Sequence, residues 1–110
     1  MDDSSFYNRG AEMLKTLAHP ARLHILDELR HGDACVCHLQ RVIRRPQAYV
    51  SQQLRVLREA GLLNTVRDGH NIYYRIEDEQ TCRVLEDVLG PAGVRRPEPA
   101  CPCIDSTCES

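Results

Sequence analysis

A change of hydrophobic periodicity within residues 46–76 constrains this fold more than any other feature of the chain. Three apolar residues after Pro46 recur at i, i+4 and i+7, a spacing that places them on one face of a helix. They are Val50, Leu54 and Leu57. Gly61 suits the position just after a helix. The next stretch, LLNTVRDGHNIYYRI, alternates in character around Asp68 and Gly69, which is typical of a two-stranded hairpin. A helix followed directly by a hairpin is therefore expected.

The remaining periodicity predicts further helices on both sides of this unit. Their expected ranges are about 6–17, from Pro20 to the residue before Gly32, 36–43 and 79–89. Pro20 suits a first helical position, Gly32 a helix end, and Pro46 both stops one helix and opens the next. The resulting order is two helices, a short helix, a polar-faced helix, a hairpin and a last helix. This order predicts a mainly α fold with a β-hairpin wing, a winged helix-turn-helix.

Length and composition bound the class of protein. The 110 residues suffice for one domain with a modest core. We find no apolar run long enough to span a bilayer and no signal-peptide pattern, so a soluble cytoplasmic protein with no membrane partner is expected. Six cysteines are many for a reducing compartment, and they favour metal binding or redox chemistry over a disulfide framework.

The charge is unevenly distributed. The net charge is −2, but Arg41–Arg75 contains seven arginines against Glu59 and Asp68, which leaves +5 there and −7 in the remainder. A contiguous basic block on an acidic chain can attract a phosphate backbone locally.

The polar face of the predicted 46–60 helix suits DNA recognition. Gln47, Ser51 and Gln52 can hydrogen-bond base edges in a major groove. The predicted backbone contacts are Arg44, Arg45 and Arg55, with Arg67 and His70 on the wing for the minor groove or backbone.

Three stretches carry a specific resemblance. LKTLAHPARLHILDELR, VSQQLRVLREAGLL and VRDGHNIYYRI resemble the ArsR/SmtB family of metal-sensing repressors over roughly residues 10–90. The resemblance implies a homodimer formed by the first and last helices, bound to a double-stranded inverted-repeat operator. It further implies that metal releases the DNA and derepresses a resistance operon. Residues 1–90 are thus expected to form the DNA-binding and dimerisation domain, and residues 91–110 a Pro-rich, Cys-rich tail that is mobile without a ligand. We find no constellation typical of an enzyme.

Two thiols at the start of the predicted 36–43 helix need a particular backbone. Side chains at i and i+2 point about 200° apart on a helix. Cys35 and Cys37 can share an ion only when Cys35 lies in extended backbone before the helix. A CVC pair at this place resembles the motif of arsenic/antimony sensors and of cadmium/lead sensors of the family.

Two thiolates are too few for most soft ions, and Gln40 occupies the position where some arsenic sensors of the family carry a third Cys. We therefore expect Cys101 or Cys103 of the tail to complete the site, from the same or the partner subunit. A trithiolate site favours As(III) or Sb(III) as the inducer, with Cd(II) or Pb(II) as the alternative.

Other interpretations of the cysteines stay open. The thiols can be redox sensors that form a disulfide with the tail. The tail can form a disulfide or a metal clip by itself, and a helix-start pair can simply be small buried hydrophobes. Cys82 shares an apolar side with Leu85 and Leu89, and we expect it to be buried at a dimer interface.

Overall fold

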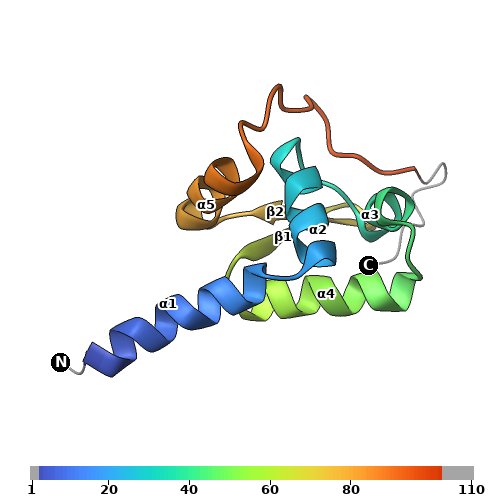
Figure 1. Ribbon diagram of the computed structural model, residues 1–110. Coiled ribbons are helices and arrows are strands. Elements are labelled where there is room, and N and C mark those ends of the chain that lie inside the picture. Colours follow the sequence, from blue (N-terminus) through green and yellow to red (C-terminus); the bar gives the residue numbers. More distant parts are fainter. Residues whose placement is uncertain (1–2, 103–110) are drawn as a thin grey trace.

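The computed structural model describes residues 3–102 and has five helices and one two-stranded sheet in that range (Figure 1). The elements are α1 (Asp3–Leu17), α2 (Pro20–Arg30), α3 (Val36–Ile43), α4 (Gln47–Glu59), β1 (Leu63–Asp68), β2 (Asn71–Ile76) and α5 (Glu79–Leu89). The predicted mainly α fold with a hairpin wing is confirmed. The predicted ranges 36–43 and 79–89 coincide with α3 and α5, while α1 begins three residues before the predicted start. None of the helices between residues 3 and 102 combines the length and the apolar character that a bilayer crossing requires.

Helix α2 is the centre of the fold, since it packs against α1, α3, α4, α5 and β2. Its apolar side meets the predicted stripe of α4 and the buried side of α5. The fully buried side chains at this junction include Ile25, Leu26, Leu29, Leu54, Leu57 and Leu85. Helix α4 is thereby fixed on its apolar side, and its polar side faces outward.

The end of α4 confirms the helix end predicted at Gly61. Gly61 has φ +82° and donates its backbone N–H to the carbonyl of Arg58 at 3.0 Å. Leu62 donates its N–H to the carbonyl of Leu57 at 3.0 Å and is itself buried. These two bonds form a Schellman motif with its hydrophobic contact. The motif turns the chain directly into the wing.

The wing is an antiparallel hairpin in which Leu63 pairs with Ile76 and Asp68 with Asn71. A short extended segment before α3 joins it through Ala34, whose N–H and C=O exchange hydrogen bonds with Tyr74 at 3.2 and 2.8 Å. On its other side Ala34 forms a parallel bridge with Ala100 of the tail. The described part of the tail runs from α5 across the end of α2 toward α3 (Figure 1). The sequence analysis expected the tail to reach the thiol pair when a ligand binds, but it did not predict this backbone bridge. The mobility of residues 91–110 without a ligand stays a prediction.

The cap of α5 generates a stability prediction. The Asp78 carboxylate accepts hydrogen bonds from the backbone N–H of Thr81 at 2.9 Å and from its hydroxyl at 2.7 Å. Replacing Asp78 with Ala removes the N-cap and should lower the free energy of unfolding by about 1 kcal/mol in urea titrations at fixed protein concentration. Asp78→Asn keeps a capping oxygen and should be close to wild type. Equal destabilisation by both variants would contradict this role.

Candidate DNA-binding surface and thiol cluster

The predicted DNA-contacting residues of α4 lie on its outer face. Gln47, Gln52 and Arg55 are exposed and Ser51 is half-buried. The Arg55 guanidinium also donates to the Glu59 carboxylate at 3.2 Å, an exposed pair that costs little to break. A hollow beside Ser51 and Arg55 is lined by Arg58 as well. Arg58 was not singled out from the sequence beyond its place in the basic block.

The turn between α3 and α4 presents two consecutive arginines. Arg44 caps α3 in the left-handed region, with φ 62° and ψ 45°, and its N–H donates to the carbonyl of Gln40 at 2.8 Å. The Arg45 guanidinium stacks on the ring of Tyr49, 5.1 Å from its centroid. Both arginines are exposed. They line one groove together with Cys37, Gln40, Arg41 and Pro46.

The predicted wing residues are placed apart from this turn. Arg67 is in β1 and His70 in the hairpin turn, and both are exposed. The structure therefore distributes the predicted contacts over three places: the face of α4, the α3–α4 turn and the wing tip. This distribution is the one that a winged helix uses to contact a groove and its flanking backbone.

The backbone condition for the thiol pair is confirmed. Cys35 is the N-cap of α3, with φ −85° and ψ 169°, so it lies in extended backbone just before the helix. Cys35 is fully buried, whereas Cys37, in the first turn, is half-buried. The two side chains are not held apart by a regular helix.

Cys101 joins the pair from the tail. Cys35 and Tyr73 form a small buried cluster, against which Cys37 and Cys101 pack. Burial raises the pKa of the Tyr73 phenol. The hydrogen bond from Asn71 works against this, while the electrostatic influence of Cys101, Cys35 and Asp68 raises the pKa further. Cys103 lies outside the described residues. Within residues 3–102, no three His, Cys, Asp or Glu side chains are arranged to hold a metal ion. The thiols are thus gathered without forming a finished ligand set.

Tyr73 is a component of this cluster that the sequence analysis missed. Tyr73 and Tyr74 are consecutive in β2 and both are buried, although neighbouring strand residues face opposite sides. Tyr74 packs in the main helical core and Tyr73 packs against the thiols. Two adjacent aromatic residues in a hairpin strand were the available signal that both faces are covered.

Two carboxylates hold the surroundings of the cluster together. Glu28 at the end of α2 accepts a hydrogen bond from the His38 ring of α3 at 2.7 Å and one from Arg96 of the tail at 3.0 Å. Asp33 accepts from Arg75 of β2 at 2.7 Å and from Arg95 at 3.0 Å. Burial works to raise the pKa of Glu28, but the bond and charge of His38, and then those of Arg96, outweigh it and hold the pKa below its ordinary value of 4.5.

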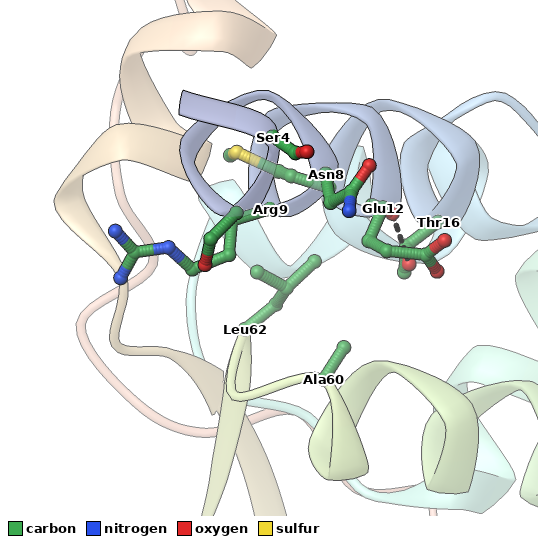
Figure 2. A pocket seen from close by; sticks show the side chains of 9 residues that line it. Ser4, Asn8, Arg9, Glu12, Thr16, Ala60 and Leu62 are labelled. Carbon is green, nitrogen blue, oxygen red and sulfur yellow. Dashed lines mark hydrogen bonds between the residues drawn. The ribbon is translucent and has the colours of Figure 1, made fainter. Parts of the chain in front are cut away.

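A larger hollow than the groove of the α3–α4 turn lies elsewhere. It is bordered by α1 and by the turn after α4, where Asn8, Glu12 and Thr16 lie across from Ala60 and Leu62 (Figure 2). The Thr16 hydroxyl donates to the backbone carbonyl of Glu12 at 2.9 Å. Nearby apolar side chains of α1 and α5 are exposed in the single chain: Phe6, Tyr7, Leu14, Val88 and Leu89. Cys82 of α5 is exposed as well, and its burial in a dimer stays a prediction.

The fold and the outward polar helix define a winged helix-turn-helix DNA-binding protein. Residues 19–65 match the family described as "Bacterial regulatory protein, arsR family". The chain is 39% identical over 87 residues to the transcriptional regulator NmtR of Mycobacterium tuberculosis, covering 79% of this chain and 72% of that one. The chain therefore belongs to the arsR family of bacterial regulatory proteins.

Two further likenesses agree with this assignment. A biofilm growth-associated repressor of Agrobacterium fabrum is 43% identical over 76 residues, which cover 69% of this chain; the chain spans 65% of that relative's length, under two thirds of it. A homodimeric winged helix-turn-helix domain of Mb0332 from Mycobacterium bovis superposes with a TM-score of 0.72 at 30% identity, covering 79% of this chain and 81% of that one. The family and these proteins are regulators, which confirms the prediction of a non-enzyme.

The lowered pKa of Glu28 predicts an acid-dependent loss of stability. A carboxylate whose pKa is lowered by folding contributes stability that is present above its ordinary pKa and is lost as the pH falls through the folded value. Glu28→Gln should therefore destabilise the protein at about pH 7, and the difference from wild type should narrow toward about pH 3 in urea titrations. Glu98→Gln, which alters an exposed tail carboxylate, is the control. A difference that does not depend on pH would overturn this assignment.

Proposed function

We propose that this protein is a homodimeric transcriptional repressor that releases its operator DNA when a thiophilic metal or metalloid binds the thiol cluster. One observation carries the proposal: the N-cap of α3 and a tail thiol lie in one cluster, and Cys37 of that cluster also lines the basic groove of the α3–α4 turn. The ligand site and the DNA-binding unit thus share one short helix.

The DNA-binding part of the proposal is supported by the outward face of α4. Gln47, Ser51 and Gln52 can contact bases, since amide and hydroxyl groups both donate and accept. Arg44, Arg45 and Arg55 would bind phosphates, and Arg67 with His70 the minor groove or backbone. The relative from Agrobacterium fabrum is named a repressor, which supports repression as the mode of regulation.

The dimer is supported by the exposed apolar side chains of α1 and α5. Phe6 and Leu14 on α1 and Val88 on α5 are large apolar side chains that are exposed in the single chain, and a subunit interface would cover them. The similar domain of Mb0332 is described as homodimeric. A two-fold dimer presents two α4 helices, which matches an inverted-repeat operator on double-stranded DNA.

The inducer we propose is As(III) or Sb(III), with Cd(II) or Pb(II) as the alternative. The donors would be Cys35 and Cys37 with Cys101 or Cys103. Their type suits soft ions. Cys35, Cys37 and Cys101 already pack in one cluster, and they would need to converge further to bind an ion.

The groove supplies a physical reason for release. A ligand held by Cys37 would occupy the wall of the groove that Arg41, Arg44 and Arg45 line. Convergence of Cys35 and Cys37 on one ion would also change the first turn of α3, which sets the position of the α3–α4 turn. Both effects weaken phosphate contacts, and a coupling of about 1–3 kcal/mol is typical between two such sites.

The same thiol cluster supports a second candidate, a redox-sensing repressor. Hydrogen peroxide would oxidise two of the clustered thiols, Cys35, Cys37 and Cys101, to a disulfide and would itself be reduced to two waters. Release by peroxide in the presence of a chelator would favour this candidate over metal sensing.

Arg44 separates DNA binding from folding. Its left-handed backbone suits glycine, so Arg44→Gly relieves roughly 1 kcal/mol of strain, which offsets the added entropy of the unfolded chain. Stability should change little. Affinity for an operator duplex selected from random DNA should fall. The magnitude of the slope of log K against log salt should decrease by about 1.8, because the homodimer loses two phosphate contacts at about 0.9 each. Arg83→Ala on α5 removes the same charge elsewhere and should leave that slope unchanged.

The inducer is tested by fluorescence anisotropy on the same duplex under reducing conditions. As(III), Sb(III), Cd(II), Pb(II) and Zn(II) are titrated into wild type, Cys35→Ser, Cys101→Ser/Cys103→Ser and Cys82→Ser. We expect arsenite to lower the operator affinity of wild type and of Cys82→Ser by roughly 5–150-fold. Cys35→Ser and Cys101→Ser/Cys103→Ser should stay bound to the operator. Release of the tail variant would exclude the tail thiols as ligands. Release by peroxide alone would replace metal sensing with redox sensing.

A further inference from the structure

We propose that Arg95 and Arg96 are positioning residues that dock the tail so that Cys101 joins Cys35 and Cys37 of the same subunit. The inference rests on the proposed thiol site and specifies where its third ligand comes from. It assigns to the tail a fixed path within one chain rather than a reach across a dimer.

Arg96 makes the central contact. Its guanidinium donates to the Glu28 carboxylate at 3.0 Å and to the backbone carbonyl of Gly32 at 2.8 Å, and its own N–H donates to the carbonyl of His31 at 2.5 Å. The side chain is 27% exposed. A planar guanidinium can serve a carboxylate and a carbonyl together, which a lysine ammonium cannot do in the same geometry. The Arg96 side chain therefore binds the end of α2 through the Glu28 carboxylate and the Gly32 carbonyl.

Gly32 leaves the space for this grip. A Cβ at Gly32 would lie 3.1 Å from the Cβ of Arg96 and 3.3 Å from its Nε, and the backbone there has φ +141°. The second residue after α2 is thus a glycine for two reasons, its conformation and the close approach of the tail.

Asp33 receives the second arginine. Its carboxylate, 9% exposed, accepts from Arg95 at 3.0 Å and from Arg75 of β2 at 2.7 Å. The hydrogen bond and charge of Asp33 raise the pKa of Arg75 above its ordinary value. One carboxylate therefore links the wing, the segment before α3 and the tail.

The backbone then sets the register of the thiols. Ala100 donates its N–H to the carbonyl of Asp33 at 2.8 Å and accepts from the N–H of Cys35 at 3.1 Å. Cys101 follows directly, and it packs in the cluster of Cys35. Between the two anchors the tail contains Pro97 and Pro99, which favour a stiff extended chain. The arginine contacts and this spacer together deliver Cys101 to the thiol pair.

Docking is first tested without metal, by hydrogen exchange on the full chain. In Arg95→Ala/Arg96→Ala, the amides of Cys35 and Ala100 should exchange about tenfold faster, because charged hydrogen bonds that hold the tail are lost. Gly32→Ala keeps both arginines but obstructs Arg96, and it should raise the same rates. Arg83→Ala is the matched control, because it removes an exposed ion pair with Glu79 on α5. It should leave the exchange rates of the Cys35 and Ala100 amides unchanged. Circular dichroism checks that each variant is folded.

The ligand contribution is tested by Cd(II) titration, following the thiolate-to-metal absorbance, which scales with the number of bound thiolates. Wild type should have the three-thiolate intensity, and the double arginine variant should require about tenfold more Cd(II) to reach it. A mixed dimer of Cys35→Ser/Cys37→Ser and Cys101→Ser/Cys103→Ser subunits should lack that intensity, since neither chain has a complete set.

The outcomes are distinct. Restored intensity in the mixed dimer would show a tail that crosses between subunits and would overturn the proposal. Unchanged amide exchange in both docking variants, with the absorbance present in wild type, overturns the role of the arginines alone. No Cd(II)–thiolate absorbance in wild type would overturn the proposed thiol site itself.

Discussion

The extended segment Asp33–Cys35 is the constraint on which the rest of the structure depends. Ala34 is hydrogen-bonded to Tyr74 of the wing on one side and is bridged to Ala100 of the tail on the other. Its extended backbone starts α3 at Val36 and puts Cys35 outside the helix. If this segment continued α2 or α3 as helix, β2 would lose its backbone hydrogen bonds with Ala34. The side chains of Cys35 and Cys37 would then point apart. The pairing with the wing, the bridge to the tail and the position of Cys35 outside α3 therefore all follow from the extended conformation of these three residues.

Charge explains why the tail occupies its position. Glu28 and Asp33 lie at the end of α2, where the helix dipole already disfavours negative charge. Arg75, Arg95 and Arg96 neutralise this region from β2 and from the tail. Because both carboxylates are largely covered, they need these partners more than exposed carboxylates would. Arg75 belongs to the basic block Arg41–Arg75, whereas Arg95 and Arg96 add positive charge from outside it.

Local patterns in the sequence were enough to predict the helices and the hairpin, because periodicity, proline positions and Gly61 act within a few residues. The bounds of α3 and α5 followed from such signals. The docking of the tail could not be predicted this way, since Arg96 and Glu28 are 68 residues apart. For the thiol site, the extended backbone at Cys35 was predictable, because Cys35 and Cys37 can share an ion only when Cys35 lies outside the helix. The contribution of Tyr73 was not, because it depends on which strand face the tail covers.

Strand β2 connects the thiol cluster with the DNA-binding surface. Tyr74 packs in the helical core, while its neighbour Tyr73 packs against Cys35. One strand therefore contacts both the helical core and the thiol cluster. Cys35 and Cys101 pack in the cluster of Tyr73, and the same hairpin carries Arg67 and His70. Helix α4 is held by Leu54 and Leu57 in the main core, against which Cys37 of α3 also packs. In the proposed mechanism, ligand binding at the cluster acts on the α3–α4 turn, whose groove Cys37 lines, and on the wing, whose predicted contacts are with the minor groove or the backbone.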